Sequence, residues 1–362
     1  MTPREEQILG WIREDPLISQ QELASRAGIT RSSVSVHIAN LTRKGLLRGR
    51  GYLLGEEGYI AVVGAVNVDI SGTPETTLLP GDSNPGHVRI TMGGVGRNIA
   101  ENLCRLGRRV MMVTALGEDA NAQTMRQSCR EIGIDLTHSL TVPQGRTSTY
   151  LCLNDEQGEI VGAVSDMEIY DAITPAWLKT KLDVLNHAQM VIADCNLSEA
   201  ALAFLAERVT VPLAADPVSV KKAVHLRGAL HNLVFFKPNR PEASLLSGVE
   251  IRTHDDLPLA SKALRERGVK NVFISLGGEG VYFDDGTESG VLPCIPGPIH
   301  NTNGCGDAFL ASAASSWLDG HSLKNCALRG LAASSLCARS ESAVSPLVTP
   351  ENIAELVKCK ED

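Results

Sequence analysis

The nine residues Asn301-Thr302-Asn303-Gly304-Cys305-Gly306-Asp307-Ala308-Phe309 carry the most structural information in this chain. They run into the small-residue segment 311–318, whose composition predicts a helix. A glycine-flanked turn that opens a helix leaves unpaired backbone N–H groups aimed at one point, with the positive end of the helix dipole behind them. The segment therefore predicts an anion hole, with Asp307 at its edge placed to take a proton from a group attacking a bound phosphate. Taken alone, the pattern also fits an Asp that only caps a helix.

Length and composition limit the class of protein. With 362 residues, 43% of them hydrophobic, the chain is long enough for one large α/β domain and a small appendage. No apolar run reaches the roughly 20 residues of a membrane span, and residues 1–15 lack a signal-peptide core. The nine cysteines are scattered without a CxxC pair, which predicts neither a disulfide framework nor a zinc site. We expect a cytoplasmic protein with no membrane partner.

Charge divides the chain into a basic head and an acidic body. Residues 1–55 hold eight Lys/Arg against five Asp/Glu, a balance of +3, which leaves −11 for the remainder of a chain whose net charge is −8. A positive segment on an acidic protein indicates a separate domain with a separate partner. We therefore expect two domains, residues 1–55 and 56–362.

The head has the pattern of three short helices and a hairpin. Apolar residues recur at helical spacing in residues 4–14, and Ser19 with Glu22 has the form of a capping box before a second helix. Gly28 makes a turn, and a third helix runs from near Thr30 to Gly45. Two apolar pairs then flank an arginine-tipped Gly-Arg-Gly loop at residues 49–51.

This arrangement resembles the winged helix-turn-helix of bacterial transcription regulators. The resemblance implies that the third helix enters the major groove of duplex DNA and that the hairpin arginines lie on phosphates or in the minor groove. The alternative is a three-helix dimerisation module with incidental arginines. The candidate DNA-binding residues are Arg31, Ser32, Ser35, His37, Arg48 and Arg50.

Residues beyond Tyr59 alternate strand and helix patterns. The expected strands are near-continuous apolar runs, typical of a parallel sheet buried on both faces. They are Ile60–Val66, Val110–Ala115, Met190–Ala193, Val211–Ala215, Leu233–Phe236 and Val272–Ser275. Helices are expected between them, for example over Asn98–Leu106, Glu199–Val209 and Leu259–Arg267.

Polar clusters follow five of these six strands. They begin at Asn67, Asp194, Asp216, Lys237 and Leu276. In an open α/β sheet, ligands bind outside the carboxyl ends of the strands, so these clusters predict one shared site. Two stretches, residues 71–91 and 146–166, break the rhythm and predict strands of a small lid, which phosphoryl transfer needs to exclude water.

Several motifs in this body resemble the PfkB (ribokinase-like) family of carbohydrate kinases. Gly93-Gly94-Val95-Gly96-Arg97-Asn98 is similar to the family's N-terminal signature, and residues 301–309 are similar to its C-terminal signature. Gly64-x-x-Asn67-x-Asp69, Asn239-x-x-Glu242 and Ser275-Leu276-Gly277 match its other recurring elements. The resemblance implies a doubly wound, mostly parallel α/β sheet with a small β lid, and an enzyme that uses ATP and Mg²⁺.

The same resemblance implies roles for individual residues. Asp307 is expected as catalytic base, and Gly304, Cys305 and Gly306 as the anion hole. The expected substrate-binding residues are Asn67, Asp69, Gly94, Asn98, Thr149 and Asp166. The expected nucleotide and Mg²⁺ residues are Asn239, Glu242 (to the metal through water), Ser275, Gly277 and Gly280.

Within the family, Gly93–Asn98, residues 147–150 and residues 165–167 resemble the pseudouridine kinase branch. A carboxylate at Asp166 would suit the N–H donors of a uracil-like ring, which predicts a nucleoside substrate in preference to free ribose. Asn301 replaces a common Asp, which puts the family's frequent monovalent-cation activation in doubt.

We expect an ATP-dependent kinase of a nucleoside or ribosyl sugar, as a homodimer that binds DNA through its head. Two alternatives remain open at this level. One is a transcription regulator whose kinase-like body senses a ligand without turnover, and the other is a kinase whose head no longer binds DNA.

Overall fold

The computed structural model describes residues 1–15, 18–48, 53–54, 58–157 and 159–361. The chain separates into two compact units, Met1–Gly58 and Tyr59–Asp362. None of the helices in these ranges is long and apolar enough to cross a membrane.

The N-terminal unit has the three helices and the hairpin predicted for it. Its elements are α1 (Pro3–Glu14), α2 (Gln20–Ala27), α3 (Arg31–Arg43), β1 (Leu47–Arg48) and β2 (Leu53–Leu54). Ile8, Leu23, Val34 and Leu41 pack into one small core because each faces inward at helical spacing. Gly28 ends α2 in the left-handed conformation, with φ of +63°. The tip of the predicted hairpin, including Arg50, lies outside the described residues.

A partly buried ion pair joins the first helix of this unit to the end of the third. The Glu5 carboxylate, only 3% exposed, accepts hydrogen bonds from Lys44 Nζ at 2.7 Å and from the Thr2 amide at 2.8 Å. The Lys44 hydrogen bond, followed by that from Thr2, lowers the pKa of Glu5 to about 2. At Ser19, where the sequence predicted a capping box, one of its two hydrogen bonds forms: Ser19 Oγ accepts from the Glu22 amide. A complete capping box is found at the start of α1, between Thr2 and Glu5.

The C-terminal unit is built on a nine-stranded sheet, in which seven neighbouring strands are parallel and the two at one edge are antiparallel. In spatial order its strands are β17 (Ser289–Leu292), β16 (Val281–Asp284), β15 (Asn271–Ser275), β14 (Leu233–Phe236), β13 (Leu213–Asp216), β12 (Met190–Asp194), β3 (Tyr59–Val63), β6 (Arg109–Val113) and β8 (Ile134–Asp135). The order reverses between β3 and β12, so the loops after these two strands flank the switch point at which ligands bind in such sheets.

Helices cover both faces of this sheet, which explains the near-continuous apolar strands. Ile60 and Val62 point to one core, while Ala61 and Val63 point to the other. On the first face lie α4 (Val95–Arg105), α5 (Ala120–Ile132), α12 (Cys305–Leu318) and α13 (Leu323–Ala338). On the second lie α6 (Pro175–Lys179), α7 (Leu182–Asn186), α8 (Glu199–Arg208), α9 (Val220–Ala223), α10 (Arg240–Ser247) and α11 (Leu257–Glu266).

The remaining elements complete the body. Helix α14 (Pro350–Glu361) packs on α13, and β7 (Ala115–Leu116) pairs with β9 (Leu140–Thr141). The 3₁₀ helices are Glu168–Ala172, Val224–Leu226, Leu230–Asn232, His254–Asp256 and Gly277–Glu279. Two predicted helices begin earlier than their apolar pattern indicated, α4 at Val95 and α12 at Cys305, because a glycine turn rather than a polar cap starts each of them.

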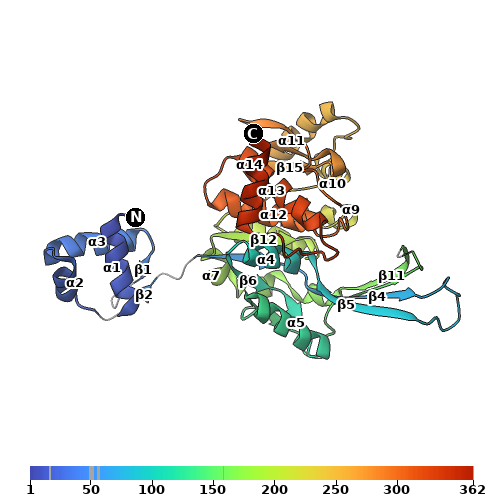
Figure 1. Cartoon of the computed structure of the whole chain (residues 1–362), viewed down its shortest axis with the longest axis horizontal. Coiled ribbons are helices and arrows are strands. Elements are labelled where there is room, and N and C mark those ends of the chain that lie inside the picture. The colour runs from blue at the N-terminus through green and yellow to red at the C-terminus, as the bar shows by residue number, and fades with distance from the viewer. Residues whose placement is uncertain (16–17, 49–52, 55–57, 158, 362) are drawn as a thin grey trace. The chain divides into compact units, whose positions relative to one another are not determined.

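A second sheet forms the lid and projects from the body, as Figure 1 shows. It has the order β11 (Ile160–Asp166), β10 (Thr149–Asn154), β4 (Asn67–Pro74) and β5 (Gly86–Gly93). The two stretches that broke the strand–helix rhythm thus do form strands of one small sheet. β4 follows β3 after only three residues, so the lid begins at the switch point.

Candidate active site

The turn before α12 has the backbone geometry of an anion-binding helix N-terminus. Gly304 is the N-cap with φ of +79°, and a Cβ at this position would lie 1.8 Å from the carbonyl oxygen of Ala343. Only glycine meets both demands. The Ala308 amide bonds the Gly304 carbonyl at 2.9 Å and closes the first helical turn. The amides of Gly306 and Asp307 precede that bond, so they lack a carbonyl partner within the helix and can donate to a bound anion.

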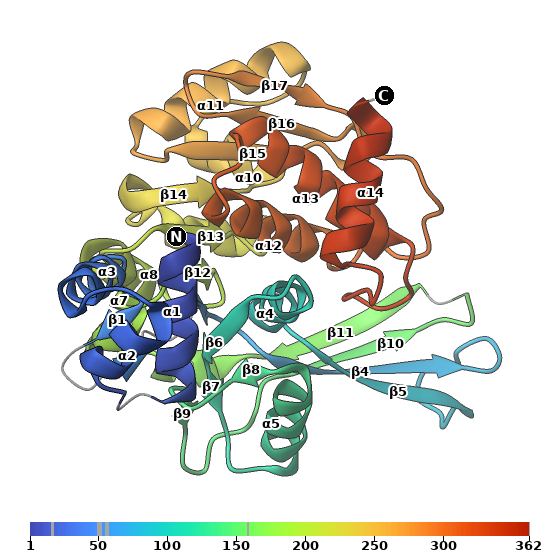
Figure 2. The same cartoon turned by 60° about the vertical axis from the view of Figure 1, so that its left-hand side comes forward.

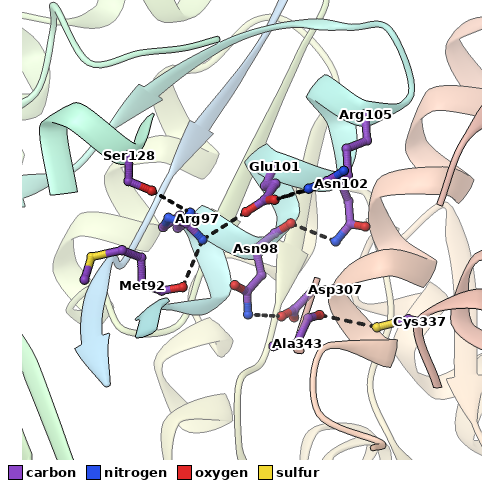
Figure 3. A network of polar contacts seen from close by, with 10 residues as sticks. All are labelled: Met92, Arg97, Asn98, Glu101, Asn102, Arg105, Ser128, Asp307, Cys337 and Ala343. Carbon is purple, nitrogen blue, oxygen red and sulfur yellow. Dashed lines mark hydrogen bonds and ion pairs between the residues drawn. The ribbon is translucent and has the colours of Figure 1, made fainter. Parts of the chain in front are cut away.

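Asp307 contacts the other signature of the chain directly. It is the third residue of α12 and not its N-cap, so the capping interpretation of this Asp is excluded. Asn98 Nδ2, from the first turns of α4, donates to Asp307 Oδ2 at 2.9 Å, and both side chains are 8% exposed. Figure 2 shows α4 and α12 side by side, and Figure 3 shows the contact. Asn98 Oδ1 has no hydrogen-bond partner among the described residues, which leaves it available to a substrate hydroxyl.

The protonation of Asp307 is governed by its surroundings. Burial, and then the negative charge of Asp216, raise the pKa of Asp307 well above its usual range, against the hydrogen bond from Asn98 and the charge of Lys237. A carboxylate with a raised pKa is a stronger proton acceptor than an exposed one.

Helix α4 is fixed by an ion-pair network that the sequence analysis missed (Figure 3). Arg97, 5% exposed, pairs with Glu101 at 3.0 Å, and Glu101 also pairs with Arg105 at 2.8 Å. The Arg97 guanidinium donates to the Met92 carbonyl at the end of β5 and to Ser128 Oγ on α5. The network therefore joins α4 to the base of the lid and to the neighbouring helix.

Gly94 lets α4 approach the loop after β3. It has φ of +100°, and a Cβ there would lie 2.6 Å from the Ala65 carbonyl oxygen. Across the switch point, the buried Asp194 carboxylate at the end of β12 accepts from the Ala65 amide at 2.7 Å. Burial raises the pKa of Asp194. The loop between β3 and Asn67 therefore packs against Gly94 on one side and is hydrogen-bonded to Asp194 on the other.

Asn67 and Asp69 lie at the start of β4, as the polar cluster predicted. Asn67 Nδ2 donates to Asp69 Oδ1 at 3.4 Å, and Asn67 Oδ1 accepts from Ser148 Oγ at 3.2 Å. Burial raises the pKa of Asp69, while the Asn67 contact and the Arg97 charge oppose that shift. An acid–amide pair of this kind suits the vicinal hydroxyls of a sugar.

The register of the lid sheet places Asp166 on the opposite face from Asp69. Side by side in the sheet, Asp69 aligns with Tyr150 and Tyr150 with Ser165. Thr149 and Asp166 align with each other one residue away, and therefore on the opposite face. A one-residue offset decides the face of a strand residue, and the alternating pattern alone did not show which face lies on the Asp69 side.

A pocket of about 560 Å³ lies beside the anion hole. It is lined by every residue predicted for the nucleotide, from two separate segments of the chain: Asn239 and Glu242 at the start of α10, and Ser275, Gly277 and Gly280 at and after the end of β15. Cys305, Gly306 and Asp307 line the same pocket. The isolated bridge between Asn239 and Ser275 explains why these segments, distant in sequence, meet at one place.

The carboxylates of this pocket suit a hard cation that keeps most of its waters. Asn239 is the N-cap of α10 and forms a capping box with Glu242, in which Glu242 Oε2 accepts from the Asn239 amide. Burial raises the pKa of Glu242. Asp216 lines the pocket close enough for its charge to add to that shift. Among the described residues, no group of three His, Cys, Asp or Glu side chains could hold a metal ion. One or two carboxylates with phosphate and water are a usual Mg²⁺ environment.

Lys237 is a site residue that the sequence analysis did not assign. It follows β14, is 6% exposed and lines the pocket. Its Nζ lies 4.0 Å from Asp216 Oδ2, and a Cβ placed on Gly306 would be 3.2 Å from Nζ. Within the described part of the chain the ammonium makes no hydrogen bond. A buried cation beside the anion hole, with one distant carboxylate, is suited to a phosphate oxygen. In the sequence, the signal that could have identified Lys237 was the cluster Lys237-Pro238-Asn239 directly after an apolar strand.

Four of the residues predicted to bind DNA lie on α3 of the N-terminal unit: Arg31, Ser32, Ser35 and His37. Arg31, Ser32 and Ser35 are exposed, and Ser35 Oγ bonds Gln20 of α2 at 2.9 Å. His37 is half-buried, with Nδ1 unpartnered among the described residues. The backbone of Arg48 lies in β1, while Arg50 is outside the described residues.

Comparison with protein families agrees with this division of the chain. The family described as pfkB family carbohydrate kinase matches residues 57–350, and the family described as winged helix-turn-helix DNA-binding matches residues 1–48.

Two curated relatives from Escherichia coli strain K12 span most or all of the chain. The uncharacterized sugar kinase YeiI is 35% identical and the alignment covers 99% of each chain. Pseudouridine kinase is 36% identical, with 84% of this chain and 97% of the relative covered. The solved ribokinase of Arabidopsis thaliana, in complex with ribose and ATP, has a TM-score of 0.73 over 83% of this chain and 99% of that one. At 22% identity this last likeness shows the fold, which is ribokinase-like.

Proposed function

Since this chain belongs to the pfkB family of carbohydrate kinases and carries a winged helix-turn-helix domain before the kinase, we propose that it transfers the γ-phosphate of ATP to the 5′-hydroxyl of a nucleoside such as pseudouridine. The observation that carries this proposal is the 2.9 Å contact between Asn98 and Asp307. It joins a side chain suited to a sugar hydroxyl to the carboxylate at the edge of the anion hole. A primary hydroxyl bound between them lies next to its proton acceptor.

Each step of the transfer has a residue in the described site. Asn67, Asp69 and the free Oδ1 of Asn98 bind ribosyl hydroxyls, and Asp307 accepts the proton of the attacking hydroxyl. The amides of Gly306 and Asp307 hold the phosphate oxygens on which charge develops. ATP supplies the phosphoryl group, and Mg²⁺ neutralises phosphate charge when held through water by Glu242 and Asp216.

The nucleoside preference rests on the relative and on the inner face of the lid. Tyr150 and Ser165 lie on the Asp69 side of the sheet, where a base attached to the ribose would be placed. Tyr150 offers a ring for stacking and Ser165 a hydroxyl for hydrogen bonding. This replaces the role first expected of Asp166.

We expect kcat/KM for pseudouridine to exceed that for ribose by up to roughly 10⁴, the discrimination available to a site that hydrogen-bonds its substrate. Tyr150→Ala should raise the activation free energy for pseudouridine by about 1–3 kcal/mol, the value of one base–aromatic stack. The kcat/KM for ribose should stay nearly unchanged. Tyr150→Phe, which keeps the ring, is the control. Steady-state assays with both substrates check this. A ribose value equal to or above that for every nucleoside tested would refute the preference.

The lid also supports a homodimer. Its outer face presents apolar side chains in adjacent rows, with Val88 71%, Ile90 61% and Val164 65% exposed. Contiguous exposed apolar patches of this kind mark interaction sites. A second copy of the chain, bringing the same apolar face, would cover it and place two helix-turn-helix domains in one particle, which matches the two half-sites of a typical operator.

We expect the full chain to bind duplex DNA as a dimer through the exposed face of α3. Arg31→Ala should change which sequences are preferred, at a cost of about 1–3 kcal/mol at the contacted base. Arg4→Ala on α1 is the control and should leave the preference unchanged. Selection from a genomic fragment library, with light scattering for the mass of the complex, checks both points. A protein without DNA affinity at low salt would contradict the proposal.

A further inference from the structure

Two cysteines face each other behind the anion hole. Cys305 is the first residue of α12 and lines the pocket, while Cys337 lies at the end of α13 and is fully buried. Cys305 Sγ lies 3.5 Å from the Ser334 carbonyl, one turn before Cys337, and Cys337 Sγ lies 3.7 Å from the Asn303 carbonyl. Each sulfur therefore lies within 4 Å of a carbonyl close in the chain to the other cysteine.

The two thiols differ in reactivity. The interaction between the two thiols lowers the pKa of Cys305 and raises the pKa of Cys337. A helix N-terminus also stabilises a thiolate, and the thiolate is the reactive form. Cys305 is therefore the nucleophile with access to the pocket, and Cys337 is the buried partner beside it.

We propose that Cys305 and Cys337 are a redox modification site, at which a reversible disulfide turns the kinase off. The inhibitory part rests on the proposed kinase activity, whereas the chemistry of the cysteine pair does not. Transient disulfides with a sensing role occur in proteins whose thiols are otherwise reduced.

A peroxide is the oxidant class that fits this pair. The Cys305 thiolate attacks one peroxide oxygen, so that an S–O bond forms, the O–O bond breaks, and the leaving hydroxide takes a proton to become water. The Cys337 sulfur then attacks the Cys305 sulfenic acid. The S–S bond forms, the S–O bond breaks, and a second water leaves with the Cys337 proton. Two thiols and one hydrogen peroxide thus give one disulfide and two waters.

The disulfide would disturb the backbone that forms the anion hole. Cys337 Sγ bonds the Ala343 carbonyl at 3.3 Å, a contact drawn in Figure 3. That same carbonyl oxygen packs against Gly304, where a Cβ would lie within 1.8 Å. Oxidation removes the Cys337 proton from this contact and draws Cys305 toward α13. The helix N-terminus then moves, and the loss of one well-aligned anion-hole donor costs about 10²–10³ in kcat.

The test treats the reduced full-length protein with hydrogen peroxide, with and without Mg·ATP. Kinase activity is followed together with mass spectrometry of non-reduced peptides. We expect a 305–337 linked peptide, a loss of kcat of about 10²-fold that dithiothreitol reverses, and slower oxidation when Mg·ATP fills the pocket. Cys337→Ala should stop at a Cys305 sulfenic acid, trapped by dimedone. Cys326→Ala, a buried cysteine on the same helix, should behave like the parent.

Failure of this proposal can be told apart from failure of the proposed function. Inactivation without the linked peptide, or the linked peptide with unchanged turnover, overturns the switch. If the untreated protein transfers no phosphate, yet the linked peptide forms and weakens ATP binding in calorimetry, the modification site stands and the kinase proposal fails.

Discussion

Asp307→Asn is expected to lower kcat by about 10²–10⁴, the usual cost of losing a general base. The amide keeps the size of the side chain but cannot take the hydroxyl proton. Substrate affinity should stay within a few-fold, because the ribosyl contacts that we propose for Asn67 and Asp69 do not involve Asp307. Steady-state turnover together with calorimetric binding of the nucleoside measures the two effects separately.

The control for this variant lies on the same helix. Asp319→Asn, at the C-terminal end of α12, removes a carboxylate that pairs with Arg108 and is distant in sequence from the anion hole. It should leave kcat nearly unchanged. Equal turnover by Asp307→Asn and the parent would remove Asp307 from the mechanism.

The pH dependence follows from the same residue. Because burial and Asp216 raise the pKa of Asp307, its base form is lost as pH falls through a value above the ordinary 3.8 of an Asp. The acid limb of the kcat/KM profile should therefore lie higher than for an exposed Asp, and activity should be retained above it.

Lys237→Met is expected to have the second largest effect, a loss of about 10²–10³ in kcat, comparable to removing one preorganised donor to the developing charge. The ammonium lies beside Gly306, and the nearest charged partner that the described residues offer it is Asp216 at 4.0 Å. Its loss should also reduce the preference for ATP over ADP, since ADP lacks the phosphate that we place there. Calorimetric titration with both nucleotides measures this preference.

Two further readouts separate this role from a structural one. The Lys237 charge lowers the pKa of Asp307, so Lys237→Met should move the acid limb of the pH profile upward. Lys222→Met is the matched control, because Lys222 is half-buried but bonds Asn196 and does not line the pocket. A Lys237→Met protein that keeps the parent's preference for ATP and its acid limb would contradict the assignment.

Most of the fold could be predicted because it depends on local patterns. Apolar runs buried on both faces gave the six expected strands, and the glycine turns at Gly94 and Gly304 marked the helices that carry the two signatures. Edge strands such as β16 and β17 were missed, since they pair antiparallel and are short. Their partners are set by tertiary packing and not by periodicity.

The site could be predicted only as far as motifs mark it. Residues of the nucleotide loops share one pocket, as the motifs indicated. The face of Asp166 depended on the lid register, which a one-residue shift reverses. Lys237 was marked only as the start of a polar cluster and given no role, because its position beside Gly306 is a contact across 69 positions that no local pattern encodes.

The most direct test is to incubate the purified full-length protein with Mg·ATP and pseudouridine and to identify the products by mass spectrometry and ³¹P NMR. We expect one 5′-monophosphate to form for each ADP released. A protein that binds both ligands yet forms no phosphorylated nucleoside or sugar would contradict the account and favour a transcription regulator that senses its ligand without turnover.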